Sequence, residues 1–192
     1  MKGRQSDLPP LLFWRRVLAA DPMQQDWRRA ALTAMSRNDH RNVLAGAVAG
    51  LGGTIAIGAM EWFSLTAHYP LAVIPFATSI VLVMGSPTVE PAQPRALIGG
   101  HLVTALVGFV VLKLTGPQAW AAAVAVGLAI LAMYVTGTFH PPAGINPLLV
   151  VSGNLPLTFL LVPVLSGAVL LSAFAYVWHR WVRRQPWPQR WL

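Results

Sequence analysis

Charge is nearly absent from the middle of this chain. Residues 42–179, a stretch of 138 residues, hold only four charged side chains, Glu61, Glu90, Arg95 and Lys113. A soluble domain carries about 25% charged residues, whereas this whole chain carries 10% and has a mean hydropathy of +0.56. The depletion predicts a membrane domain over residues 43–180.

Basic residues flank that domain on both sides. Residues 1–41 contain eight Lys or Arg and four Asp, and four arginines follow, Arg180, Arg183, Arg184 and Arg190. Clustered basic residues can neutralise nucleic-acid phosphates, and the isoelectric point is 11.4. Because these residues border apolar spans, we interpret them as topology determinants that face the cytoplasm and anionic lipid, and we expect no nucleic-acid partner. We expect a multi-pass protein of the bacterial plasma (inner) membrane with a cytoplasmic N-terminus.

Five apolar runs compete to cross the bilayer, which takes about 20 helical residues. They are Val43–Met60, Leu71–Gly85, Ala96–Leu114, Ala119–Thr138 and Leu155–Trp178. Arg-rich segments at both ends favour an even number of crossings, and the second run is short. We therefore predict an all-α polytopic helical membrane protein of four to five spans, with residues 71–85 re-entrant; the alternative is five spans with the C-terminal tail outside.

The flanking segments complete the expected organisation. Residues 1–42 form an Arg-rich leader in which Asp21 can cap a helix and Pro22 can start it, typical of an amphipathic helix at the membrane interface. Residues 181–192 form a basic C-terminal tail. Gly46 and Gly50 allow close helix packing, either between copies in a homo-oligomer or between helices of one chain.

Two Pro-rich connectors, residues 86–95 and 139–147, interrupt the apolar runs. Irregular backbone at membrane depth is tolerated only where it is buried in protein or lines a watery cavity. We expect new helices to begin at 96–100 and 143–146, where free N–H groups favour a small anion; the alternative is a kinked element without a ligand. The two halves suggest a repeat of helix, broken loop and helix, a pattern that points to transporter binding sites.

Three side chains near these connectors could carry the chemistry. Arg95 can attract anions at the mouth of a pore, with Glu90 as a possible partner, or it can be a cytoplasmic loop residue that follows the topology rule. His101 and His140 could donate a proton to a weak-acid anion, or they could be buried histidines bonded to carbonyls.

Cofactors, metals and catalysis are not expected. The chain has no cysteine, and neither histidine has metal ligands at close spacing. Enzyme signatures are missing as well, and an intramembrane enzyme would need His140 beside a nucleophile such as Ser86 or Thr138. The candidate anion-binding residues are Ser86, Gln93, Arg95, Gly99, Gly100, His101, His140, Pro141, Pro142, Gly144 and Asn146.

Several ordered motifs resemble the HPP family of integral membrane proteins. They are Pro75-Phe76 with Ser79, Ser86-Pro87, Ala92-Gln93-Pro94-Arg95, Gly99-Gly100-His101 and His140-Pro141-Pro142-Ala143-Gly144. The resemblance covers residues 43–180 and implies a small helical membrane protein, usually with four spans, some of whose plant chloroplast relatives are linked to nitrite transport. Two departures, Ile145-Asn146-Pro147 after the triplet and Thr88–Pro91 in the first connector, bear on the identity of the substrate.

Together these observations favour a passive or proton-linked conduit for a small inorganic anion, with nitrite as the first candidate. The alternative is a non-transporting membrane interaction or scaffold protein that acts through its leader.

Overall fold

The computed structural model describes residues 40–66, 68 and 74–191. The chain forms two compact units, Met1–Ala45 and Gly46–Leu192. The architecture below is that of the second unit. The expected leader over residues 1–42 lies almost entirely outside the described residues.

Four apolar helices are long enough to cross a membrane, and the described residues include no strand. These spans are Asn42–Thr66, Pro94–Thr115, Ala119–Thr136 and Leu160–Val182. They correspond to α3 (His40–Thr66), α5 (Pro94–Thr115), α6 (Ala119–Thr136) and a composite of η3 (Leu160–Leu165), α8 (Ser166–Val177) and η4 (Trp178–Val182). The predicted all-α polytopic membrane fold is confirmed.

Two short helices lie between the spans. Helix α4 (Ala77–Gly85) has 9 residues and α7 (Ile145–Ser152) has 8. At 1.5 Å per residue each is only about 12–14 Å long, less than half of a hydrocarbon layer. Helix α4 falls in the run expected to be incomplete. Helix α7 begins at Ile145, within the expected start at 143–146. It was not among the five apolar runs, because the apolar stretch 148–151 between Pro147 and Gly153 is too short to stand out as a span.

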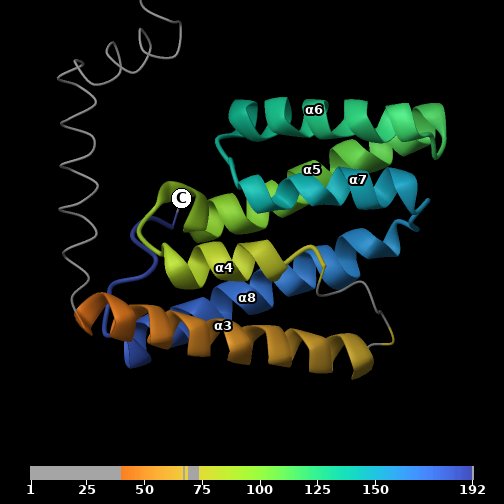
Figure 1. The fold of residues 1–192 in the computed structure, drawn as a ribbon. Helices are drawn as coiled ribbons and strands as arrows, with labels where there is room; N and C mark the ends of the chain where they lie inside the picture. The colour runs from red at the N-terminus through yellow and green to blue at the C-terminus, as the bar shows by residue number, and fades with distance from the viewer. Residues whose placement is uncertain (1–39, 67, 69–73, 192) are drawn as a thin grey trace, which may run out of the picture. The chain divides into compact units, whose positions relative to one another are not determined.

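The six helices follow a long–short–long order twice, with opposite directions (Figure 1). Helices α3 and α5 run from left to right in this view and α4 returns, whereas α6 and α8 run from right to left and α7 returns. The repeated unit therefore centres on a short helix. This differs from the expected register, which matched connector 86–95 with connector 139–147. Both Pro-rich connectors and the C-terminus instead lie at one end of the bundle.

Local chemistry sets the helix boundaries near that end. Gln93 is extended, with φ −81° and ψ 155°, and Pro94 takes the first helical position of α5, where its missing N–H costs no hydrogen bond. The expected start at 96–100 is thus too late. Helix α6 ends at Gly137, which is left-handed with φ 63°, and the Thr138 N–H donates to the Met133 carbonyl at 2.9 Å.

Each short helix is packed among long ones. Helix α4 contributes Ile80, Val83 and Met84 to a core shared with α3 and α8. Helix α7 contributes Val150 and Val151 to cores shared with α5, α6 and η3. This packing surrounds helices that are too short to cross the bilayer.

Candidate functional site

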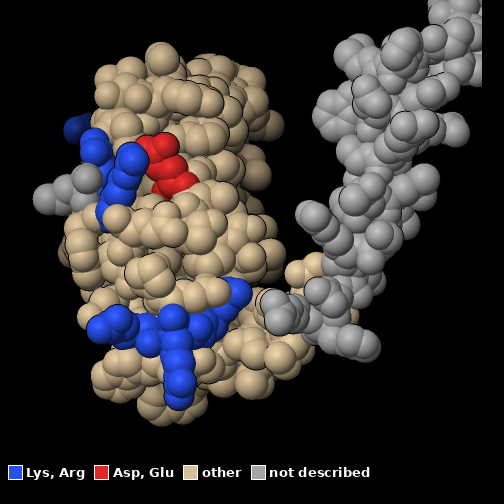
Figure 2. Space-filling model, turned by 90° about the vertical axis from the view of Figure 1, so that its left-hand side faces the viewer, with Lys and Arg blue, Asp and Glu red and all other residues tan. Residues whose placement is uncertain are grey.

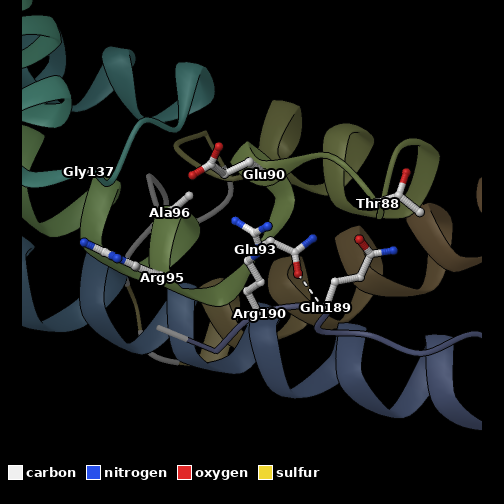
Figure 3. A pocket seen from close by; sticks show the side chains of 8 residues that line it. All are labelled: Thr88, Glu90, Gln93, Arg95, Ala96, Gly137, Gln189 and Arg190. Atoms are coloured by element: carbon white, nitrogen blue, oxygen red, sulfur yellow. Dashed lines mark hydrogen bonds between the residues drawn. The ribbon is translucent and has the colours of Figure 1, made fainter.

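A polar pocket opens at the end of the bundle where the connectors meet (Figure 3). Its volume is about 290 Å³, and its lining comes from connector 86–93, the first turn of α5, the end of α6 and the C-terminal segment; the residues are Thr88, Glu90, Gln93, Arg95, Ala96, Gly137, Gln189 and Arg190. We call it the basic pocket, because it combines two arginines with one glutamate.

The two arginines reach the basic pocket from opposite sides. In Figure 3 the guanidinium of Arg190 points between Glu90 and Gln93, whereas that of Arg95 points toward Gly137. Arg95 Nη2 donates to the Thr136 carbonyl at 3.3 Å. A guanidinium has five N–H donors, so this bond leaves Arg95 with donors for an anion.

The first turn of α5 adds backbone donors next to the arginines. Pro94 has no N–H, and the regular helical bonds begin with Leu97 N–H, which donates to the Gln93 carbonyl at 2.9 Å. The amides of Arg95 and Ala96 are therefore the ones free of helical bonds, and they lie at the positive end of the helix dipole. The anion-binding amides expected at Gly99 and Gly100 lie further inside the helix.

Gln93 holds the pocket together. Its Nε2 donates to the carbonyls of Pro87 at 2.8 Å and Val89 at 3.1 Å, and its Oε1 accepts from the Gln189 N–H at 2.8 Å. The side chain is 5% exposed. Its amide is fully used in joining the connector to the C-terminal segment, which makes Gln93 a positioning residue.

A second polar site, which we call the histidine cluster, is closed inside the protein. Ser79 Oγ lies 2.9 Å from His101 Nε2 and 2.8 Å from His140 Nε2. The two imidazole centroids are 5.2 Å apart. All three side chains have 0% exposure. The hydroxyl beside His140 is thus Ser79, not Ser86 or Thr138.

The direction of each hydrogen bond in the histidine cluster follows from its ends. His140 Nδ1 lies 2.6 Å from the Pro91 carbonyl, which only accepts, so Nδ1 carries the proton. His140 Nε2 of the neutral ring then accepts from the Ser79 hydroxyl, and Ser79 in turn accepts from His101 Nε2–H. The remaining His101 Nδ1 accepts from Asn146 Nδ2 at 3.0 Å. One carbonyl thus fixes both tautomers.

The electrostatics agree with this neutral arrangement. His140 lies between the spans, and burial lowers its pKa to about 4, against the hydrogen bond to Pro91, which raises it. The sequence alone would place its titration near neutral pH. A group of three His, Cys, Asp or Glu side chains able to hold a metal is not found among the described residues.

Asn146 closes the other end of the cluster. Its Nδ2 lies within 3.1 Å of the His101 carbonyl and of Thr104 Oγ1, as well as facing His101 Nδ1. The His101 carbonyl excludes the flipped orientation of the Asn146 side-chain amide, since Asn146 Oδ1 would then face the carbonyl oxygen. Asn146 Oδ1 is buried without a hydrogen-bond partner.

Close backbone contact joins α5 to the second connector. A Cβ on Gly100 would lie 2.8 Å from the Thr138 carbonyl and 2.7 Å from the Cβ of His140, and one on Gly99 would lie 2.6 Å from Thr138 Cγ2. Glycine at both positions lets the connector lie against the helix and brings His140 to Ser79.

All but one of the residues expected from the sequence fall into four places. Gln93 and Arg95 line the basic pocket, His101, His140 and Asn146 form the histidine cluster, and Gly99 and Gly100 form the contact between connector and helix. Pro141, Pro142 and Gly144 lie in η2 (Pro141–Gly144), directly after His140. Ser86 is exposed and does not line the basic pocket.

Sequence reasoning did not assign a site role to several participants, namely Ser79, Thr88, Thr104, Gln189 and Arg190. Ser79 belongs to a quoted motif, and a hydroxyl inside an apolar run is a signal for a buried partner. Arg190 was interpreted as part of a basic tail. Nothing in its local sequence marks its return to the connector, which depends on Trp187, only 3% exposed in the core.

Comparisons with known proteins agree with this architecture. Two transmembrane proteins of Dictyostelium discoideum are each 36% identical to this chain, over 136 residues (67% of this chain, 48% of the relative) and over 124 residues (60% and 40%). The chain thus spans about half or less of the length of these curated relatives. No solved structure matches it. The family model for the HPP transmembrane region matches residues 36–188, and the chain belongs to the HPP family.

Proposed function

We propose that this protein conducts a small inorganic anion across the membrane, with nitrite as the first candidate, and that the anion enters through the basic pocket. Membership of the HPP family and the apolar helices fit a membrane transporter or channel. The observation that carries the proposal is the pairing of Arg95 and Arg190 in one pocket with the free amides of α5. A bare anion is prohibitively unstable in hydrocarbon, and such donors can replace its water.

The fold supports a route from that pocket. The histidine cluster lies where α4, α5 and connector 137–144 meet, and these segments belong to the two oppositely directed halves. Transporters built from inverted halves bind substrate at the interface between them. Because both histidines are neutral and fixed by hydrogen bonds, we assign them the role of holding the halves together around the route.

Charge supports an orientation in a bacterial plasma membrane. Arg95, Arg180, Arg183, Arg184 and Arg190 lie at the end of the bundle that carries the connectors, and Lys113 lies in the last turn of α5, at the other end. Figure 2 shows Lys and Arg gathered on the connector end. The positive-inside rule then places the basic pocket on the cytoplasmic side.

Nitrite uptake into proteoliposomes tests the proposal. The double variant Arg95→Gln/Arg190→Gln should take up nitrite at about one tenth of the wild-type rate or at a still lower rate, since each charge-assisted hydrogen bond is worth about 1.5–3 kcal/mol. Arg180→Gln is the matched control, because Arg180 is exposed at the same end but does not line the pocket. Equal uptake by the double variant and the control would remove the basic pocket from the route.

The wild-type protein itself tests the anion class. If vesicles containing it take up nitrite, nitrate and chloride no faster than empty vesicles, the transport proposal fails. The alternative function, an interaction protein acting through residues 1–42, concerns residues that lie almost entirely outside the described part of the chain. Deleting residues 1–38 separates the two, because the conduit should keep its flux.

A further inference from the structure

We propose that Glu90 makes the basic pocket selective for monovalent over divalent oxyanions. The inference rests on the proposed function and adds the substrate class. Three charged groups line the pocket, Arg95, Arg190 and Glu90. Their formal sum is +1, so one monovalent anion neutralises the site, whereas a divalent anion such as sulfate leaves an uncompensated negative charge.

Glu90 lines the same pocket as the two arginines. Figure 3 shows it across the pocket from Gln93, with the Arg190 guanidinium pointing between them. Neither arginine forms an ion pair with Glu90 within the described part of the chain. Its charge is therefore not cancelled by direct contact, and it acts on whatever anion enters.

Hydrogen bonds hold the backbone around Glu90 in place. Glu90 starts the short helix η1 (Glu90–Ala92), and its carbonyl accepts from the Gln93 N–H at 3.0 Å. On either side, the Val89 carbonyl accepts from Gln93 Nε2 and the Pro91 carbonyl accepts from His140. A connector held at three successive carbonyls fixes the backbone of Glu90 at the pocket, so its carboxylate stays within reach of an anion that binds there.

Coulomb's law gives the size of the effect. In a small pocket open to water, one unit charge of the protein changes the affinity for a monovalent anion on the order of tenfold. For a divalent anion the same protein charge acts twice as strongly in free energy. Removing the negative charge of Glu90 therefore favours any anion, and favours a divalent anion on the order of tenfold more than a monovalent one. Discrimination between valences, rather than overall affinity, reports this role.

The experiment measures inhibition of nitrite uptake by sulfate in proteoliposomes of phosphatidylcholine, which carry no anionic headgroup. In Glu90→Gln, sulfate should inhibit at concentrations about tenfold lower than in the wild type. Glu90→Asp keeps the charge and should keep the wild-type inhibition. The control Glu61→Gln makes the same charge change in α3, away from the basic pocket, and should also leave inhibition unchanged.

Three outcomes would overturn the inference. If the wild type takes up nitrite and Glu90→Gln shows unchanged sulfate inhibition, the role of Glu90 falls while the transport function stands. If the wild type takes up no anion, the proposed function falls, and this inference with it. If phosphatidylglycerol added to the vesicles abolishes nitrite uptake by the wild type, the pocket belongs to a lipid headgroup.

Discussion

At the scale of single residues, the small side chain of Ser79 contributes strongly to stability. Its hydroxyl satisfies His101 and His140 at once, and an alanine would leave two buried ring nitrogens without partners. We expect Ser79→Ala to lower the free energy of unfolding by about 3 kcal/mol. In detergent this should reduce the melting temperature by roughly 10 °C.

The neighbouring hydroxyl provides the control. Thr78 precedes Ser79 on α4 but is exposed, so Thr78→Ala should leave the melting temperature nearly unchanged. Similar losses in the two variants would mean that the hydrogen bonds of Ser79 contribute little, and the fixed tautomers of the histidine cluster would lose their support.

Charged and titratable residue types explain which site residues could be predicted from the sequence. An arginine beside a Pro-rich break, and histidines in apolar surroundings, stand out because a charge or a proton is costly there. The sequence does not say which atoms meet. Gln93 was assigned to the substrate, but its amide binds two carbonyls and an N–H that lie 4, 6 and 96 residues away, and only the folded chain brings those groups together.

At the scale of elements, α4 depends on another helix to end where it does. Its last carbonyls need donors, and they come from the C-terminal span: His179 Nε2 donates to Val83 at 3.0 Å and Arg183 Nη1 to Met84 at 2.9 Å. We expect Arg183→Ala to destabilise the last turn of α4 by about 1–2 kcal/mol. Hydrogen–deuterium exchange of residues 82–86 should become faster, whereas Arg180→Ala, an exposed control, should not change it; equal exchange in both variants would contradict this capping.

Periodicity and length predicted the long helices, whereas for α7 the Pro-rich break predicted only the start of a helix at 143–146 and not its length. A span is recognised by about 20 apolar residues, while a helix of 8 residues that follows Pro141 and Pro142 and contains Pro147 resembles a loop. The glycines show a similar limit. Gly100 and Gly108 pack within the chain, against His140 and Pro147, whereas a Cβ added to Gly46 or Gly50 would meet no atom of another segment within 4 Å. The homo-oligomer through Gly46 and Gly50 stays a prediction.

At the scale of the whole molecule, the short helices determine at which end of the bundle each connector lies. Each short helix runs antiparallel to the two long helices that precede and follow it in the sequence, and those two long helices run in the same direction. Both connectors and the C-terminus therefore lie at one end of the bundle. The C-terminal segment can then complete the basic pocket with Gln189 and Arg190, two residues that lie just beyond the family match at 36–188.

Single cysteines test this arrangement cleanly, because the chain has none of its own. Ser86 is exposed in the connector at the basic end, and Gln118 is exposed in the turn between α5 and α6 at the other end. With the basic end cytoplasmic, a membrane-impermeant maleimide should label Gln118→Cys in intact cells and Ser86→Cys only after permeabilisation. The reverse pattern would invert the orientation. Labelling of both variants in intact cells would contradict the placement of the two loops at opposite ends, since neither end could then be shielded by the bilayer.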